Sequence, residues 1–173
     1  MTVAGSPSPA AGPGFGSARF RTVLLATDLS PASAAATDTA FDLAATFPAR
    51  LLVVSVIDPG SLRHPGGRFF ARVDQVRAER ERIATELVAR GRSRGVSVDF
   101  LVWEGEPGES IVEAAVSERA DMIVVGSHGR GAVGRFLIGS VSDHVVRNAP
   151  CPVLVVRSGT DKVVGSAANG PAG

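Results

Sequence analysis

The residues between positions 126 and 140 form the part of the sequence best suited to chemistry. Five glycines fall within fourteen positions here, namely Gly126, Gly129, Gly131, Gly134 and Gly139. Because glycine has no Cβ, several backbone N–H groups of such a loop can turn toward one point, and a following helix N-terminus adds partial positive charge. The segment is therefore a candidate phosphate cradle, in which Ser140 could cap the next helix or donate its hydroxyl to a phosphate oxygen.

Two well-known phosphate motifs fit this segment poorly. Residues 129–134 read Gly-x-Gly-x-x-Gly, the dinucleotide-binding pattern, but that pattern belongs after the first strand of its fold. It also needs an acidic residue about twenty positions later, where this chain has Cys151 and Val153. The P-loop pattern requires Lys followed by Ser or Thr, and the segment contains neither pair. A tight turn without a ligand is the simpler alternative, although this many glycines favour anion binding.

Asp28 is the acidic residue that could assist such a cradle. It follows the first apolar run of the chain, in the order Asp28-Leu29-Ser30-Pro31. Its carboxylate could hold a magnesium ion that bridges phosphates, or it could accept hydrogen bonds from an adenosine. The structural alternative is a strand-to-helix turn in which Asp28 accepts hydrogen bonds from backbone N–H groups. The sequence does not choose among these roles.

The composition favours a small or neutral partner. The 173 residues include 18 basic and 17 acidic side chains, so the net charge of +1 gives no electrostatic footprint for nucleic acid or an anionic membrane. The single cysteine, Cys151, cannot form an intramolecular disulfide, which fits a reducing compartment. Neither a secretory leader nor a membrane-spanning stretch is recognisable. We therefore expect a cytoplasmic protein with no nucleic-acid partner and no membrane partner.

Short β-branched runs alternate with longer helical patterns, which indicates successive βαβ units. Strands are predicted at Thr22–Thr27, Leu51–Ile57, Val96–Val102, Met122–Val125 and Val153–Val156. Helices are predicted from Ser30 as N-cap to about Phe47, from Phe70 to near Gly95, from Pro107 to Ala120, and after the glycine-rich loop to Asn148. Strict alternation predicts an α/β fold, a doubly wound open five-stranded parallel sheet with four helices. Residues 19–157 are the predicted domain, with disordered tails at 1–18 and 158–173.

The glycine-rich segment resembles the nucleotide motif of the universal stress protein family. That motif reads Gly-x2-Gly-x9-Gly followed by Ser or Thr, and it is matched by Gly126, Gly129, Gly139 and Ser140. The segments 23–30, 53–58 and 149–156 are similar to the same family. The resemblance spans about residues 20 to 157 and implies an adenine nucleotide alpha hydrolase-like fold with strand order 3-2-1-4-5.

The resemblance also implies roles for individual residues. Asp28 would lie beside the nucleotide, Val56 would line the adenine, and the motif glycines with Ser140 would hold the phosphates and ribose. The implied ligand is ATP, with or without magnesium, and family members that keep the motif bind ATP. In the implied strand order, Asp28 and Gly126 would face each other where ligands bind in doubly wound sheets.

Three classes of function are open to this sequence. A nucleotide-responsive stress or regulatory protein leads, because the cradle contains no lysine and only Asp28 as a candidate acid for fast phosphoryl transfer. A slow ATPase is the second class. The third is an interaction module that binds no nucleotide, which leaves the spacing of Gly139 and Ser140 from Gly129 unexplained.

The last predicted strand suggests how the protein assembles. Val153–Val156 is short, uncharged and strongly β-prone, and in an open sheet it should occupy an edge. Natural proteins normally cover or charge such an edge, and neither lysine nor proline interrupts this run. We therefore expect a homodimer joined through the last strand, as the resemblance also implies.

Overall fold

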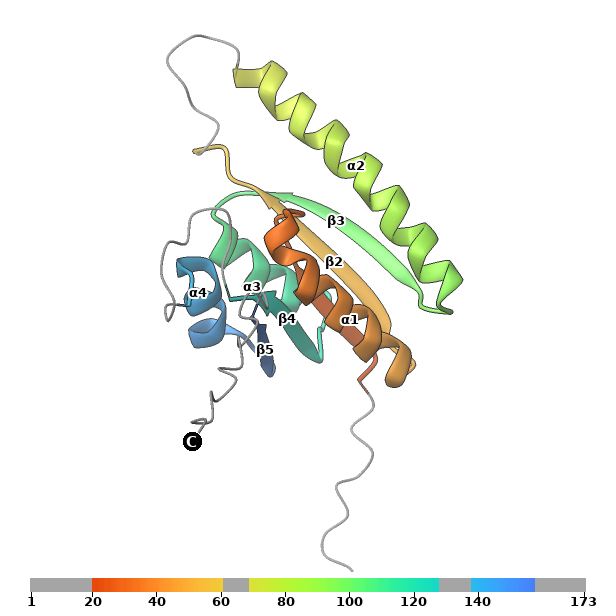
Figure 1. The fold of residues 1–173 in the computed structure, drawn as a ribbon. Coiled ribbons are helices and arrows are strands. Elements are labelled where there is room, and N and C mark those ends of the chain that lie inside the picture. Colours follow the sequence, from red (N-terminus) through yellow and green to blue (C-terminus); the bar gives the residue numbers. More distant parts are fainter. Residues whose placement is uncertain (1–19, 61–68, 128–137, 158–173) are drawn as a thin grey trace, which may run out of the picture.

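The computed structural model describes residues 20–60, 69–127 and 138–157 (Figure 1). Both expected tails and Gly129 lie outside these described residues. The strands are β1 (Thr22–Ala26), β2 (Arg50–Ile57), β3 (Val98–Glu104), β4 (Met122–Gly126) and β5 (Val153–Val156). The helices are a 3₁₀ turn η1 (Pro31–Ser33), α1 (Ala34–Thr46), α2 (Phe69–Ser93), α3 (Pro107–Ser117) and α4 (Ser140–Asn148).

The strands form one parallel sheet in the order β3-β2-β1-β4-β5. This order confirms the predicted α/β, doubly wound, five-stranded fold with four α-helices. The strand order reverses between β1 and β4, which pair directly, with Ala26 opposite Val125. Ligands of doubly wound sheets bind at such a reversal, beyond the carboxyl ends of the strands.

Each face of the sheet is covered by its own pair of helices (Figure 1). On one face, α1 and α2 bury Phe41 and Leu87 against Leu25 and Val53. On the other, α3 and α4 bury Ile111 and Val145 against alternate residues of the same strands, such as Leu24, Leu52 and Ile123. Because successive strand side chains point to opposite faces, a continuously apolar strand serves both cores.

Several element boundaries depart from the prediction. The third strand runs from Val98 to Glu104, two residues later than expected, and the third helix ends at Ser117 rather than Ala120. Pro31 opens a 3₁₀ turn before the first α-helix, and the side chain of Ser30 makes no capping bond to it. Ser140 is likewise no cap: Gly139 occupies the N-cap position and Ser140 is the first residue of α4.

The amino ends of the strands are tied together by charged side chains. One carboxylate oxygen of Asp121 accepts hydrogen bonds from the backbone N–H groups of Arg21 and Thr22, at 2.8 and 2.9 Å. The guanidinium of Arg50 bonds Asp99 and Glu118, each at 3.0 Å. These contacts connect β1, β2, β3 and the loop before β4 at the end of the sheet opposite the carboxyl ends of the strands.

A glycine allows α2 to pack closely at this same end. A Cβ atom placed on Gly91 would lie 2.3 Å from a methyl carbon of Val98 and 2.8 Å from the carbonyl oxygen of Val96. Neither distance is compatible with a side chain, so the approach of α2 to the start of β3 depends on glycine at position 91.

The two edge strands of the sheet, β3 and β5, differ in how far other elements cover them. Strand β3 lies beneath α2 and ends at Glu104, which forms an ion pair with Arg77 of that helix. Strand β5 is uncharged, and the side chain of Leu154 is 37% exposed. Within β3, Trp103 is the register partner of Val56, and both side chains pack on the α3 and α4 face.

Candidate functional site

The fold brings most of the predicted site residues to one end of the sheet. Asp28 follows β1 and Gly126 ends β4, so the two residues stand at neighbouring strand ends. Val56 lies at the level of Asp28, because Ala26 pairs with Val54 two residues earlier. The connection after β1 leads to α1 on one face, whereas the connection after β4 leads to α4 on the other. The space between these diverging connections is the crevice in which a ligand can bind.

The glycine-rich segment is fixed at both of its ends. The N–H of Gly139 donates to the carbonyl of Ser127 at 2.8 Å, which brings the end of the segment back to the strand where it began. The hydroxyl of Ser142, a buried side chain, donates to the carbonyl of Gly126 at 2.7 Å. Gly126, Gly139 and Ser140 therefore lie together at the start of α4. The position of Gly129 is outside the described residues.

The start of α4 has the properties of an anion site. The first N–H groups of a helix have no partner within the helix, and they carry partial positive charge. Gly139, at the N-cap, makes no side-chain cap, and Ser140 is exposed. Ser142 was missed by sequence reasoning because its role depends on the return of the loop to Gly126, which no local pattern predicts.

Asp28 adopts the turn that was its structural alternative. Its Oδ1 accepts hydrogen bonds from the Ser30 N–H at 3.0 Å and from the Ser30 hydroxyl at 2.7 Å. This arrangement is an Asx turn, which holds the carboxylate in a defined direction at the carboxyl end of β1. The hydroxyl of Ser30, expected to cap the first helix, is used here instead.

Leu29, next to Asp28, has an uncommon backbone conformation. Its φ is +60°, a left-handed value that non-glycine residues adopt only where their surroundings hold them there. The Leu29 N–H donates to the Thr27 hydroxyl at 3.0 Å. That hydroxyl donates to Ser33 at 2.9 Å, and the Ser33 hydroxyl donates to the carbonyl of Ser30 at 2.8 Å. The hydroxyls of Thr27 and Ser33 thus hold the turn from inside the protein.

Ser55 extends this set of hydrogen bonds to the second strand. Its side chain is fully buried, and its hydroxyl donates to the carbonyl of Thr27 at 2.9 Å. Arg80 of α2 donates to the same hydroxyl. Sequence reasoning missed both residues. A serine within the apolar run of β2 was the available signal, since a buried hydroxyl requires partners.

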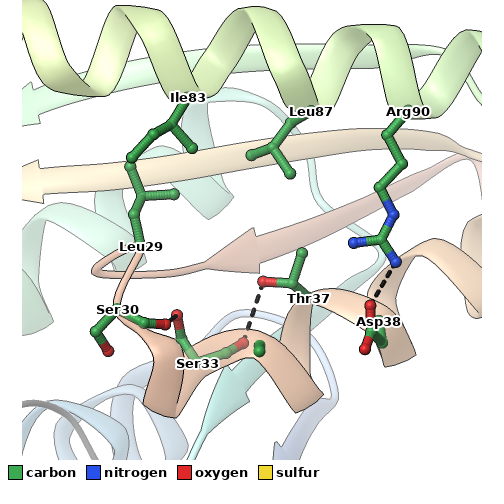
Figure 2. Close-up of a pocket in the computed structure, with 9 residues that line it drawn as sticks. Leu29, Ser30, Ser33, Thr37, Asp38, Ile83, Leu87 and Arg90 are labelled. Carbon is green, nitrogen blue, oxygen red and sulfur yellow. Dashed lines mark hydrogen bonds and ion pairs between the residues drawn. The ribbon is translucent and has the colours of Figure 1, made fainter.

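A small cavity lies beside the Asp28 turn, between α1 and α2 (Figure 2). Leu29, Ser30 and Ser33 contribute to one wall, and Leu87 and the ion pair of Arg90 with Asp38 contribute to the rest. Its volume of about 180 Å³ is below the roughly 300 to 1,000 Å³ of ligand pockets. The cavity therefore does not accommodate a nucleotide, and it lies on the α1 and α2 face rather than at the start of α4.

Two kinds of site are not found in the part of the chain that the structure describes. Among residues 20–60, 69–127 and 138–157, no three His, Cys, Asp or Glu side chains gather so that they could hold a metal ion. No helix in these ranges is both long enough and apolar enough to cross a membrane.

Comparisons with known proteins agree with this fold. Residues 19–157 match the model of the universal stress protein family. A universal stress protein of Thermus aquaticus is 43% identical over 140 residues, which cover 80% of this chain and 99% of that protein. A solved family member from Burkholderia pseudomallei is 32% identical with a TM-score of 0.67, covering 80% of this chain and 97% of that one. A universal stress protein solved in complex with cAMP is 28% identical with a TM-score of 0.59, covering 80% and 98%.

Proposed function

This chain belongs to the universal stress protein family, and we propose that it binds ATP, or another adenine nucleotide, as a nucleotide-responsive regulatory protein. One observation carries the proposal: Gly126, Gly139 and Asp28 all lie at the carboxyl end of the sheet, where the strand order reverses. The complex of a 28% identical family member with cAMP supports an adenine nucleotide as the ligand class.

In this proposal each residue has a defined part in binding. The phosphates bind at the start of α4, where Gly126, Gly129 and Gly139 leave room for backbone N–H donors and Ser140 adds a hydroxyl. Val56 presents an apolar side chain to the adenine. The Asx turn holds the Asp28 carboxylate toward the ligand, either as a hydrogen-bond acceptor for the adenosine or as a partner of a phosphate-bound magnesium ion.

The same residues argue against a fast enzyme. Rapid phosphoryl transfer requires cations that neutralise the developing charge and a residue that orients the attacking group. The only lysine of the chain is Lys162, which lies after the predicted domain. Binding with little or slow hydrolysis is therefore the expected behaviour.

The first prediction concerns affinity. Titration calorimetry of the purified protein should give a dissociation constant for ATP in the micromolar range, which corresponds to about 8 kcal/mol. ADP and cAMP, titrated in parallel, identify the preferred adenine nucleotide, and CTP controls for binding through phosphates alone. A protein that binds none of the adenine nucleotides would contradict the proposal and favour the interaction module. Steady phosphate release at about 1 to 100 per second, lost in Asp28→Ala, would instead indicate an enzyme.

The second prediction is that two copies pair through β5. The carbonyl oxygens of Pro152 and Val156 face β4, so the alternating backbone groups of Val153 and Val155 face outward. Val155→Pro should remove one of these outward N–H groups and give a monomer, whereas Val155→Thr keeps the N–H and should remain dimeric. Light scattering distinguishes the two. Wild-type protein with the 17.7 kDa monomer mass at high concentration would disprove the dimer.

A further inference from the structure

Two arginines attach the first half of α2 to the carboxyl ends of the strands. Arg77 forms an ion pair with Glu104, the last residue of β3. Arg80, one turn later, is partly buried and donates a hydrogen bond to the hydroxyl of Ser55. Figure 1 shows that α2 lies along the face of the sheet that α1 also covers, with its first turns near the carboxyl ends of the strands.

Ser55 connects Arg80 to the turn that carries Asp28. A serine hydroxyl has one proton, and that of Ser55 is donated to the carbonyl of Thr27, so Ser55 can only accept from Arg80. A hydrogen bond from a guanidinium is stronger than one between neutral groups, and it polarises the bond that follows. Ser55 is completely buried with Arg80 in place, so the guanidinium is part of what covers its hydroxyl.

Thr27, whose backbone carbonyl accepts from Ser55, uses a different group, its hydroxyl, to bond on both sides of Asp28. The Thr27 hydroxyl accepts from the Leu29 N–H and donates to Ser33, which in turn bonds the carbonyl of Ser30. Ser30 and Ser33 lie close together under α2 in Figure 2. The left-handed conformation of Leu29 persists only while these contacts hold it. Loss of the Arg80 contact would therefore loosen the residues that direct the Asp28 carboxylate.

We propose that Arg80 is a positioning residue for the nucleotide site, acting through Ser55 and Thr27 on the Asp28 turn without touching the ligand. The proposal rests on the proposed function. It makes α2 part of the nucleotide response: a ligand that orders the Asp28 turn strengthens the attachment of α2, and displacement of α2 weakens the binding of nucleotide. By thermodynamic linkage, the free energy by which the ligand strengthens the attachment of α2 equals the free energy by which the attached α2 strengthens ligand binding.

The experiment measures ATP binding and backbone protection in matched variants. Arg80→Met removes the charged donor at similar length, Arg80→Lys retains a donor, and Ser55→Ala removes the acceptor. Arg82→Met is the control, because Arg82 lies on the same helix, is exposed, and pairs only with Glu79 and Glu86 of that helix among the contacts described. Calorimetry gives the ATP affinity of each folded variant. Hydrogen exchange of the segment 27–37 reports the turn without nucleotide.

We expect Arg80→Met to weaken ATP binding about threefold to tenfold, a typical size for residues that act on a site without contacting its ligand. Exchange in the segment 27–37 should be faster in this variant, Arg80→Lys should lie nearer the wild type, and Arg82→Met should match it. The double variant Arg80→Met with Ser55→Ala should lose no more affinity than the larger single loss, because both changes break one pathway.

The results that overturn the inference are equally specific. Wild-type affinity and wild-type exchange in Arg80→Met would show that Arg80 only attaches α2. An equal loss of affinity in Arg82→Met would show a general effect of charge. If the wild type binds no adenine nucleotide, the proposed function fails. Hydrogen exchange still tests the inference in that case: unaltered exchange of the segment 27–37 in Arg80→Met would show that Arg80 does not stabilise the Asp28 turn.

Discussion

The two ends of the sheet are fixed by different kinds of side chain. At the amino end, Asp121 and Arg50 form charged contacts that connect strands. At the carboxyl end the turns are held mainly by buried hydroxyls, those of Thr27, Ser33, Ser55 and Ser142, with Asp28 and Arg80 as the charged groups that bond to hydroxyls there. Small hydroxyls fix a backbone without adding net charge. We therefore expect substitutions at the amino end to change stability and substitutions at the carboxyl end to change the proposed ligand binding.

The largest expected effect is at Gly126. Gly126→Val places a branched side chain beside the start of α4, where the phosphates are proposed to bind, and should weaken ATP binding about a hundredfold or more, which is about 2.8 kcal/mol. The fold should survive, because Val is favoured over Gly in a strand and the carbonyl that accepts from Ser142 remains. Calorimetry together with urea unfolding tests both statements. A folded variant with wild-type affinity would remove Gly126 from the site.

A glycine at the opposite end should show the reverse pattern. Gly91→Ala would force its methyl group against Val98 and the carbonyl of Val96. Overpacking of this kind costs about 1 to 3 kcal/mol, whereas the gain in helix propensity is at most about 1 kcal/mol. We therefore expect the free energy of unfolding to fall by about 1 to 2 kcal/mol while the ATP affinity of the folded protein is unchanged.

Urea unfolding measures this change, and Thr85→Ala is the matched control. Thr85 is exposed on the same helix, so its replacement gains propensity without a clash. If Gly91→Ala weakened ATP binding as strongly as Gly126→Val, the two ends of the sheet would not have separate roles.

The smallest expected effect concerns Cys151, beside the amino end of β5. Partial burial raises the pKa of its thiol, and the negative charge of Asp121 raises it further. At pH 8 the thiolate fraction is therefore lower than in the unfolded chain, and alkylation by iodoacetamide should be several-fold slower in the native protein. The pH dependence of the rate, followed by mass spectrometry, should shift upward relative to protein in urea. Saturating ATP should leave the native rate unchanged, because the nucleotide is proposed to bind at the other end.

The fold was predictable because its pattern is repeated along the chain. Five apolar runs alternate with helical periodicity, and strands covered on both faces must be apolar throughout, as Leu51 to Val54 illustrate. The boundaries were less predictable. Val96 is β-branched and buried but lies before β3, since its N–H bonds the carbonyl of Gly91 at the end of α2 rather than a neighbouring strand.

The candidate site was predictable only where a motif is contiguous. The spacing of Gly126, Gly139 and Ser140 could be read directly, and the assignment of these residues to a nucleotide stays a prediction. The contacts of Ser55 and Ser142 could not be read, because each depends on a partner from another element. Ser30 shows the same limit: the sequence predicts a cap from its hydroxyl, whereas the structure has that hydroxyl donating to Asp28 across the left-handed Leu29, with no capping bond.

The register of β3 against β2 has an optical consequence. Trp103 is the only tryptophan of the chain, and it is the neighbour of Val56, the residue proposed to line the adenine. Its indole is partly exposed and lies on the same face of the sheet. The protein thus carries a single intrinsic fluorophore one strand away from the proposed base. We therefore expect its emission to report on that position without any label, in the same solution in which binding is measured.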